Sequence, residues 1–174
     1  MTSCRLIEPA DAPALAELLR ANRDFLAPFE PARRESYFTA DGQQAAIGAA
    51  LAEHEAGRTL PYVILGDDGS LAGRITLSGI VRGVFLSCSV GYWVNQDLNG
   101  RGVATAALRE IRRVAFDELG LHRIQAETLV ANIGSQRVLE RNGFYRIGMA
   151  PAYLKIAGRW QDMVMFQVVN DQLV

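Results

Sequence analysis

Long hydrophobic runs are absent from this chain of 174 residues. The longest weakly polar run, residues 45–52, is much shorter than the roughly 18 residues that a membrane-spanning helix needs. The first nine residues also lack the apolar core of an export signal. The sequence therefore predicts a protein with no membrane partner, and we expect it in the cytoplasm.

Cysteine is scarce, because the chain holds only Cys4 and Cys88. They lie far apart, and neither belongs to a CxxC motif or a Cys/His cluster, so we expect no metal site. A catalytic thiol at Cys88 is disfavoured as well, since neither histidine of the chain has a recognisable pairing with it. Both cysteines are predicted to be small buried side chains in a reducing compartment.

An excess of charge of one sign is missing too, because the formal net charge is −1 at pH 7. This balance argues against direct nucleic-acid binding. Four arginines within residues 101–113 still favour a local anionic partner there (Arg101, Arg109, Arg112, Arg113). Hydrophobic residues make up 49% of the chain, enough for one large core, so we expect a single domain over residues 1–174.

Hydrophobic periodicity predicts strands and helices in a characteristic order. Strands are expected at residues 4–8, 62–65, 71–80, 85–94 and 123–129, with a long hairpin over residues 144–156 and 159–169. Helices are expected after Asp11, from Asp41 to Gly57, over residues 103–119 and over residues 132–142, with the two aspartates as N-caps. The order predicts an α/β (α+β) fold with a mixed, mostly antiparallel central sheet flanked by helices.

A polar glycine loop, residues 99–104, joins a predicted strand to a predicted helix. Unpaired N–H groups and the helix dipole make such a junction an anion site. A Walker loop is excluded because no GK[ST] follows, and a dinucleotide fingerprint because Thr105 stands at its third glycine position. An ordinary glycine turn remains the alternative.

Two motifs resemble those of the GNAT superfamily of N-acetyltransferases. The loop matches the pattern [Q/R]-x-x-G-x-[G/A], except that Asn99 replaces Gln or Arg, and residues 132–144 match N-x-x-[SA]-x-x-[VL]-x-x-x-x-G-F. The resemblance implies that acetyl-CoA is the co-substrate and that a strand pair splays apart to hold it. The implied cofactor-binding residues are Tyr92, Trp93, Val94, Asn99, Gly100, Arg101, Gly102, Val103, Ala104, Thr105, Asn132 and Ser135. The alternatives are core packing for the side chains of Tyr92 and Trp93, and an N-cap for Asn132.

Residues 25–31 and 154–162 resemble the RimJ/RimL-type branch, whose members include ribosomal-protein N-terminal acetyltransferases. This resemblance implies that the acceptor is the N-terminal α-amine of a protein. The mixture of aromatic and charged residues in these regions is suited to packing a peptide. The candidate substrate-binding residues are Phe25, Phe29, Tyr153 and Trp160.

The resemblance also implies an acid and a base. Glu127 matches a proposed general base, and Ser135 is the candidate acid because Leu139 stands where many relatives have a tyrosine. The alternative for Glu127 is a surface glutamate paired with an arginine. The alternative for Ser135 is a small residue tolerated near a helix cap.

We therefore expect direct attack of a primary amine on the thioester of acetyl-CoA. The expected amine is the N-terminal α-amine of a ribosomal or other protein. Two other functions stay open: acetylation of a small amine or an antibiotic, and a non-catalytic acyl-CoA-binding regulatory module. A monomer and a homodimer are equally compatible with the sequence.

Overall fold

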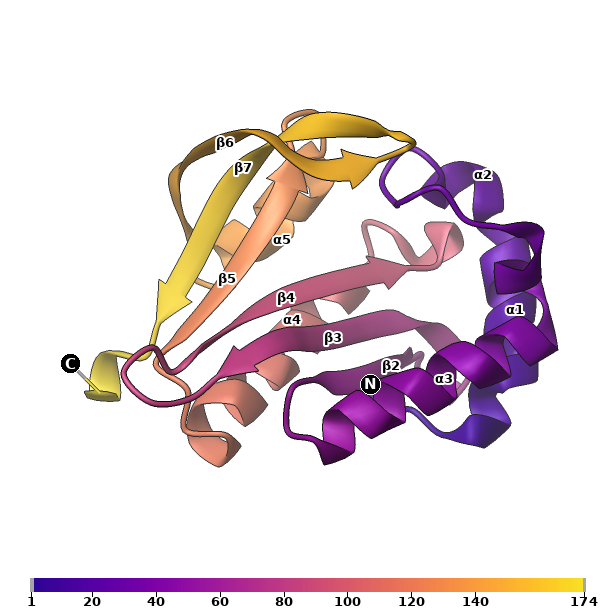
Figure 1. The fold of residues 1–174 in the computed structure, drawn as a ribbon, viewed down its shortest axis with the longest axis horizontal. Helices are drawn as coiled ribbons and strands as arrows, with labels where there is room; N and C mark the ends of the chain where they lie inside the picture. Colours follow the sequence, from indigo (N-terminus) through magenta and orange to yellow (C-terminus); the bar gives the residue numbers. More distant parts are fainter. Residues whose placement is uncertain (1, 174) are drawn as a thin grey trace.

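A computed structural model describes residues 2–173, which fold around a 7-stranded sheet in the order β1-β2-β3-β4-β5-β7-β6 (Figure 1). The strands are β1 (Ser3–Leu6), β2 (Leu60–Leu65), β3 (Leu71–Val81), β4 (Ser87–Val94), β5 (Arg123–Leu129), β6 (Tyr145–Ile156) and β7 (Arg159–Val169). Only β4 and β5 pair in parallel, and every other neighbouring pair is antiparallel. The predicted mixed, mostly antiparallel sheet is confirmed.

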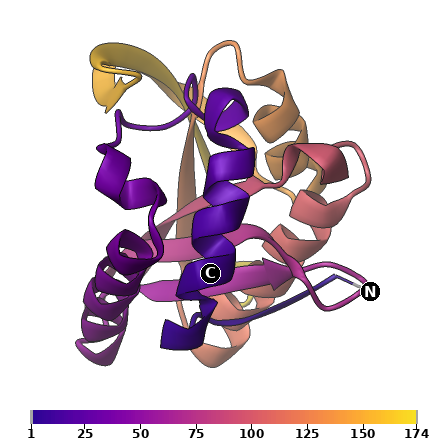
Figure 2. The same cartoon turned by 90° about the vertical axis from the view of Figure 1, so that its right-hand side faces the viewer.

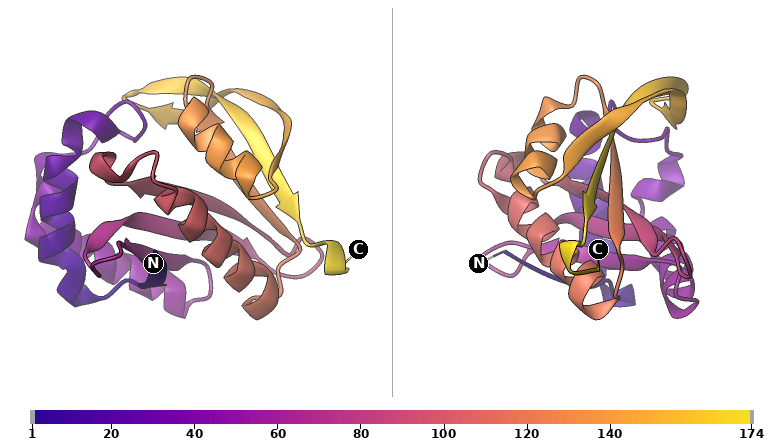
Figure 3. Two further views of the ribbon diagram at one scale, coloured as in Figure 1. Left: turned by 180° about the vertical axis from the view of Figure 1, so that it is seen from behind. Right: turned by 90° about the vertical axis from the view of Figure 1, so that its left-hand side faces the viewer.

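Helices cover both faces of the sheet (Figures 1 and 3). They are α1 (Ala12–Ala21), α2 (Arg23–Leu26), α3 (Ala40–Glu55), α4 (Val103–Arg113) and α5 (Ile133–Arg141). A π-helical turn, Val114–Glu118, extends α4, and short 3₁₀ turns occupy Pro9–Asp11, Glu35–Phe38, Gln96–Leu98 and Asp171–Leu173.

Two hydrophobic clusters hold these layers together. On one face, Leu108 and Ile111 of α4 pack against a cluster that includes Ile75 of β3. On the other face, the cluster contains Leu15 of α1 and Ile47 of α3, and Figure 2 shows both helices on that side of the sheet. The second cluster includes Ile7, which follows β1, and Val63 of β2, and Trp93 is the β4 residue packed against it. The middle of that face carries no helix (Figure 1).

The predicted splay between two strands lies between β4 and β5. These strands pair only where Ser87–Ser89 meet Arg123–Gln125. Beyond that point β4 continues along β3 as far as Val94, and β5 continues along β7 as far as Leu129. The parallel strands therefore separate toward their carboxyl ends and leave a gap in the sheet (Figure 1).

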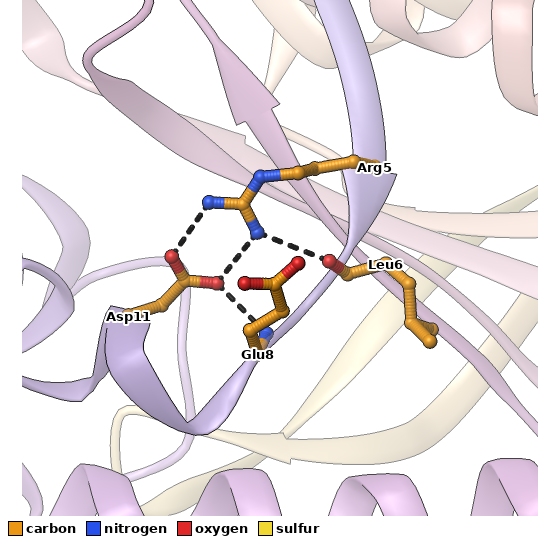
Figure 4. Close-up of polar contacts among 4 residues, drawn as sticks. All are labelled: Arg5, Leu6, Glu8 and Asp11. Carbon is orange, nitrogen blue, oxygen red and sulfur yellow. Dashed lines mark hydrogen bonds and ion pairs between the residues drawn. The ribbon is translucent and has the colours of Figure 1, made fainter.

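The two predicted helix caps have different outcomes. The cap at Asp41 is wrong: Thr39 caps α3, because its Oγ1 accepts a 3.0 Å hydrogen bond from the Gly42 N–H. Asp11 holds the N-cap position of α1, as predicted, but its side chain caps no N–H of that helix. Its carboxylate instead accepts 2.7 and 2.9 Å hydrogen bonds from Arg5 and a 2.8 Å bond from the Glu8 N–H (Figure 4). The carboxylate of Asp11 therefore pairs with the guanidinium of Arg5 on β1 and not with the first N–H groups of α1.

Both cysteines are free thiols, with Cys88 buried and Cys4 partly buried. Among residues 2–173, no helix has the length and hydrophobicity to cross a membrane. The same residues contain no cluster of three or more histidine, cysteine or acidic side chains arranged to hold a metal ion.

Candidate active site

The glycine loop leaves the beginning of α4 open. Gly100 and Gly102 have φ angles of +75° and +82°, a backbone region that favours glycine, and a Cβ at either position would meet no atom within 4 Å. Gly102 is the N-cap of α4 and provides no side-chain cap. The first N–H groups of α4 are thus left for an external acceptor, and this arrangement fits a pyrophosphate.

A cavity of about 550 Å³, which we call the loop cavity, extends from this loop to α5. Its lining includes most of the predicted cofactor-binding residues: Tyr92, Trp93, Val94, Asn99, Gly100, Gly102, Ala104, Thr105, Asn132 and Ser135. Arg101 and Val103 lie outside the lining, since Arg101 is exposed and Val103 packs into the core. Arg137 and Arg141 of α5 also line the loop cavity, and sequence reasoning missed them.

Two of the arginines predicted along α4 have other partners. Arg112 donates a 3.0 Å hydrogen bond to the Asn142 carbonyl, and Arg113 forms a 2.9 Å ion pair with Glu118. The arginines of α5 are therefore better placed than these two for an anion at the glycine loop.

A second cavity of about 400 Å³, which we call the gap cavity, lies where β4 and β5 separate. Glu127, Glu30, Arg33 and Arg74 bring the charged groups to its wall. It shares with the loop cavity the lining residues Leu26, Phe29, Tyr92, Trp93, Asn132 and Ser135. The two cavities therefore meet at the gap in the sheet.

Glu127 and Ser135 approach this gap from opposite faces of the sheet. Ala126 and Thr128 are buried on the face covered by α4 and α5, so the alternation of β5 directs Glu127 to the other face. Ser135 belongs to α5 and lies on the covered face. Since both line the gap cavity, a group held in the gap can contact one side chain on each side.

Ser135 is held by two neighbours. Its N–H donates a 3.1 Å hydrogen bond to Asn132 Oδ1, which confirms Asn132 as the N-cap of α5. Its hydroxyl lies 2.9 Å from the Tyr92 hydroxyl, and that hydroxyl lies 3.2 Å from the Ser135 carbonyl oxygen. Burial raises the pKa of Tyr92 to about 12, although the hydrogen bond with Ser135 opposes the shift, so Tyr92 keeps its proton at neutral pH.

The Tyr92–Ser135 hydroxyl pair was missed by sequence reasoning, which placed Tyr92 at the cofactor with core packing as the alternative for its side chain. A β4 residue and an α5 residue 43 positions apart carry no shared sequence signal.

Glu127 has no ion-pair or hydrogen-bond partner in a side chain of residues 2–173, so the expected alternative of an arginine-paired glutamate does not apply. Burial raises the pKa of its carboxyl, and a hydrogen bond from its own amide opposes the shift. Burial raises the pKa of Glu30 as well, against the charges of Arg33 and Arg74. A carboxylate with a raised pKa beside the gap is suited to accept a proton.

The aromatic residues predicted to bind substrate are distributed over three places. Phe25 lines the loop cavity, and Phe29 lines both cavities. Phe29 and Trp160 also line a groove of about 730 Å³ beside the β6–β7 hairpin, together with Pro28, Leu129, Val130, Ala131, Arg159, Gln161 and Asp162. We call it the hairpin groove. Tyr153 is exposed and lines none of the three, whereas its neighbour Leu154 lines the gap cavity.

Known proteins resemble the chain over nearly its whole length. A family model described as an acetyltransferase (GNAT) domain matches residues 4–145. The Bacillus subtilis (strain 168) protein named "Probable N-acetyltransferase YjcK" is 35% identical over 167 residues, covering 95% of this chain and 92% of that protein. The [ribosomal protein uS5]-alanine N-acetyltransferase of Escherichia coli (strain K12) is 36% identical over 166 residues, covering 92% of this chain and 84% of the enzyme.

A solved structure agrees with these relatives. Mycobacterium smegmatis RimJ in complex with CoA-disulfide has a TM-score of 0.94 at 30% identity, covering 99% of this chain and 83% of RimJ. With the splayed strands and the open glycine loop, these matches confirm the resemblance seen in the sequence. The chain belongs to the GNAT family, in its RimJ/RimL-type branch, and is an N-acetyltransferase that uses acetyl-CoA.

Proposed function

We propose that this enzyme acetylates the N-terminal α-amine of a protein, with ribosomal proteins as the substrate class. One observation carries the proposal: Glu127 and the Tyr92–Ser135 pair reach the gap between β4 and β5 from opposite faces. The names of relatives that acetylate ribosomal proteins support the substrate class.

Glu127 serves the incoming amine. An α-amine has a pKa of roughly 7.7–8.0, so about a tenth to a third of it is already neutral near pH 7.3. The carboxylate therefore needs only to bind the ammonium form and take its proton, directly or through a water molecule. Since its pKa is raised, Glu127 is a stronger base than an exposed glutamate.

Ser135 serves the departing sulfur. When Tyr92 donates its proton to Ser135 Oγ, the hydroxyl proton of Ser135 is directed away from Tyr92 and toward the gap. The sulfur of acetyl-CoA, held in the gap by the strand amides of β4, would then receive a proton from Ser135, while Tyr92 keeps the serine oriented.

The hairpin groove supports a peptide acceptor. It meets the gap cavity at Phe29 and Leu129, so a chain whose first residue lies in the gap cavity can continue into the groove. A hydrogen bond of 2.9 Å from the Ala157 N–H to the Glu30 carbonyl joins the hairpin to the loop after α2 and fixes the two walls. Trp160, which is 64% exposed, offers an aromatic surface to the following residues.

We also infer that residues 1–174 act as one domain in the cytoplasm, without direct contact to nucleic acid. The net charge of −1 and the continuous sheet support this inference.

The experiment that tests the function compares acceptors. Peptides that begin with a free Ala or Ser are incubated with acetyl-CoA beside aminoglycosides and polyamines, and thiol release is followed. We expect turnover of the peptides, and we expect Trp160→Ala to raise KM for peptide while leaving KM for acetyl-CoA unchanged. Turnover of the small amines alone would establish the small-amine alternative, and binding of acetyl-CoA without any turnover would establish the regulatory module.

A further inference from the structure

Arg74 is a cation that lines the gap cavity. It stands on β3 opposite Trp93 of β4, and it lines the cavity together with Glu30 and Glu127. Among residues 2–173, no hydrogen bond or ion pair joins its guanidinium to another side chain. Its five N–H donors are therefore available to a ligand.

The guanidinium of Arg74 lies in partly buried surroundings of mixed charge. The side chain is partly buried, and burial lowers the pKa of the guanidinium; Tyr37 and Glu30 oppose this shift, and Arg33 adds to it. An arginine nevertheless stays charged at neutral pH. Since no side chain of residues 2–173 takes its donors, an acceptor that enters the cavity can form charge-assisted hydrogen bonds with the guanidinium.

Arg74 and Glu127 line the gap cavity from the same face of the sheet. Arg74 and Trp93 are paired residues on the face opposite α4, and the alternation of β5 places Glu127 on the same face. The cavity that receives the amine at Glu127 therefore also carries a guanidinium on the same face of the sheet. The first residue of a peptide has a carbonyl oxygen next to its α-amine, whereas an alkyl amine does not.

We propose that Arg74 determines acceptor specificity by donating to the carbonyl oxygen of the acceptor's first residue, so that the site selects α-amino carbonyl compounds over alkyl amines. This inference rests on the proposed function and names the chemical feature by which the acceptor is recognised. A protein N-terminus carries the required pair, a primary amine and an adjacent carbonyl.

The test uses three acceptors that differ in stated atoms. An Ala-Ala-Ala peptide has the amine, the carbonyl and a continuing chain; alaninamide keeps the amine and the carbonyl; sec-butylamine has an ethyl group in place of the carboxamide. kcat/KM is measured for each with the wild-type enzyme, Arg74→Met and Arg74→Lys. If sec-butylamine turns over too slowly to follow, it is used as an inhibitor of peptide acetylation. The change in its inhibition constant from wild type to variant then replaces the change in kcat/KM.

We expect Arg74→Met to lower kcat/KM by about 10- to 100-fold for the peptide and for alaninamide, because a hydrogen bond from a charged donor is lost. The ratio for sec-butylamine should stay within about threefold, and Arg74→Lys should recover part of the loss because it keeps the charge. Arg34→Met is the matched control, since Arg34 is exposed and lines none of the three cavities. Unchanged affinity for coenzyme A in calorimetry shows that each variant is folded.

The possible failures are distinguishable. If wild-type enzyme acetylates the peptide but Arg74→Met loses activity equally on all three acceptors, or on none, the role of Arg74 is wrong and the proposed function stands. If wild-type enzyme acetylates sec-butylamine and neither carbonyl compound, the proposed function itself is wrong.

Discussion

Gly102 provides the sharpest test of the glycine loop, because two nearly isosteric substitutions separate charge from shape. With φ at +82° the position is strained for most side chains, but Asn and Asp tolerate this region best among them. A Cβ there meets open space. Gly102→Asn and Gly102→Asp therefore differ mainly by one negative charge at the beginning of α4.

The charge has opposite consequences for folding and for binding. At a helix N-terminus an aspartate is stabilising by about 0.3–1 kcal/mol, so Gly102→Asp should unfold at a temperature equal to or above that of Gly102→Asn. Against a pyrophosphate with two negative charges at about 6 Å and an effective dielectric of about 40, the repulsion is about 2.8 kcal/mol. This corresponds to an affinity for coenzyme A about 100-fold lower in Gly102→Asp than in Gly102→Asn.

Calorimetric titration with coenzyme A and a thermal melt without ligand measure the two effects separately. We expect the aspartate variant to bind more weakly although it is at least as stable. Equal affinity of the two variants would show that the loop is only a turn and that the pyrophosphate lies elsewhere.

Three other predictions concern proton transfer and the fold. Glu127→Gln should lower kcat by about 100-fold with little change in affinity for coenzyme A, and should remove the acidic limb of the pH profile, which in the wild-type enzyme lies above the ordinary glutamate pKa of about 4.3. Ser135→Ala and Tyr92→Phe should each lower kcat, and the double variant should lose less than the two single effects combined, because the hydroxyls are 2.9 Å apart. Asp11→Asn should lower the free energy of unfolding by about 1–3 kcal/mol in urea denaturation, with unchanged turnover per folded molecule, because Asp11 is 7% exposed and bound to Arg5.

The pH dependence of the last effect has a definite sign. Burial alone would raise the pKa of Asp11, but the hydrogen bonds from Arg5 and the Glu8 amide and the charge of Arg5 hold it below its usual value. This contribution to stability is therefore complete above the unfolded-state pKa of about 3.9 and is lost as the pH falls through the lower folded-state value. Asp11→Asn should lack this loss, and an identical acid dependence in variant and wild type would contradict the assignment.

For the variants of Glu127, Ser135 and Tyr92, a large fall in melting temperature with normal turnover per folded molecule would indicate structural roles.

The parts of the fold set by local pattern were predictable from the sequence. Alternating apolar residues marked the strands of the sheet, and glycines such as Gly143 marked helix ends. The loop at Gly102 and the helix at Asn132 were found because each motif is contiguous and its function depends largely on backbone groups. Local sequence therefore specified the half of the site that we propose to bind the cofactor.

Side-chain contacts between distant segments of the chain could not be predicted from the sequence, because they depend on long-range packing. The Tyr92–Ser135 contact and the presence of Arg74 and Glu127 in one cavity depend on how strands and helices from separate segments come together. The N-cap position of Asp11 was predicted correctly, but the partner of its side chain was not, because the guanidinium of Arg5 belongs to another element.

The position of the acetyl group on a product tests the central claim most directly. A peptide with a free N-terminal Ala and one internal lysine is incubated with the enzyme and acetyl-CoA, and tandem mass spectrometry locates the modification. We predict acetylation at the α-amine alone, and its loss when the same peptide is supplied with a blocked N-terminus. Acetylation at the lysine, or equal modification of the blocked peptide, would contradict the account.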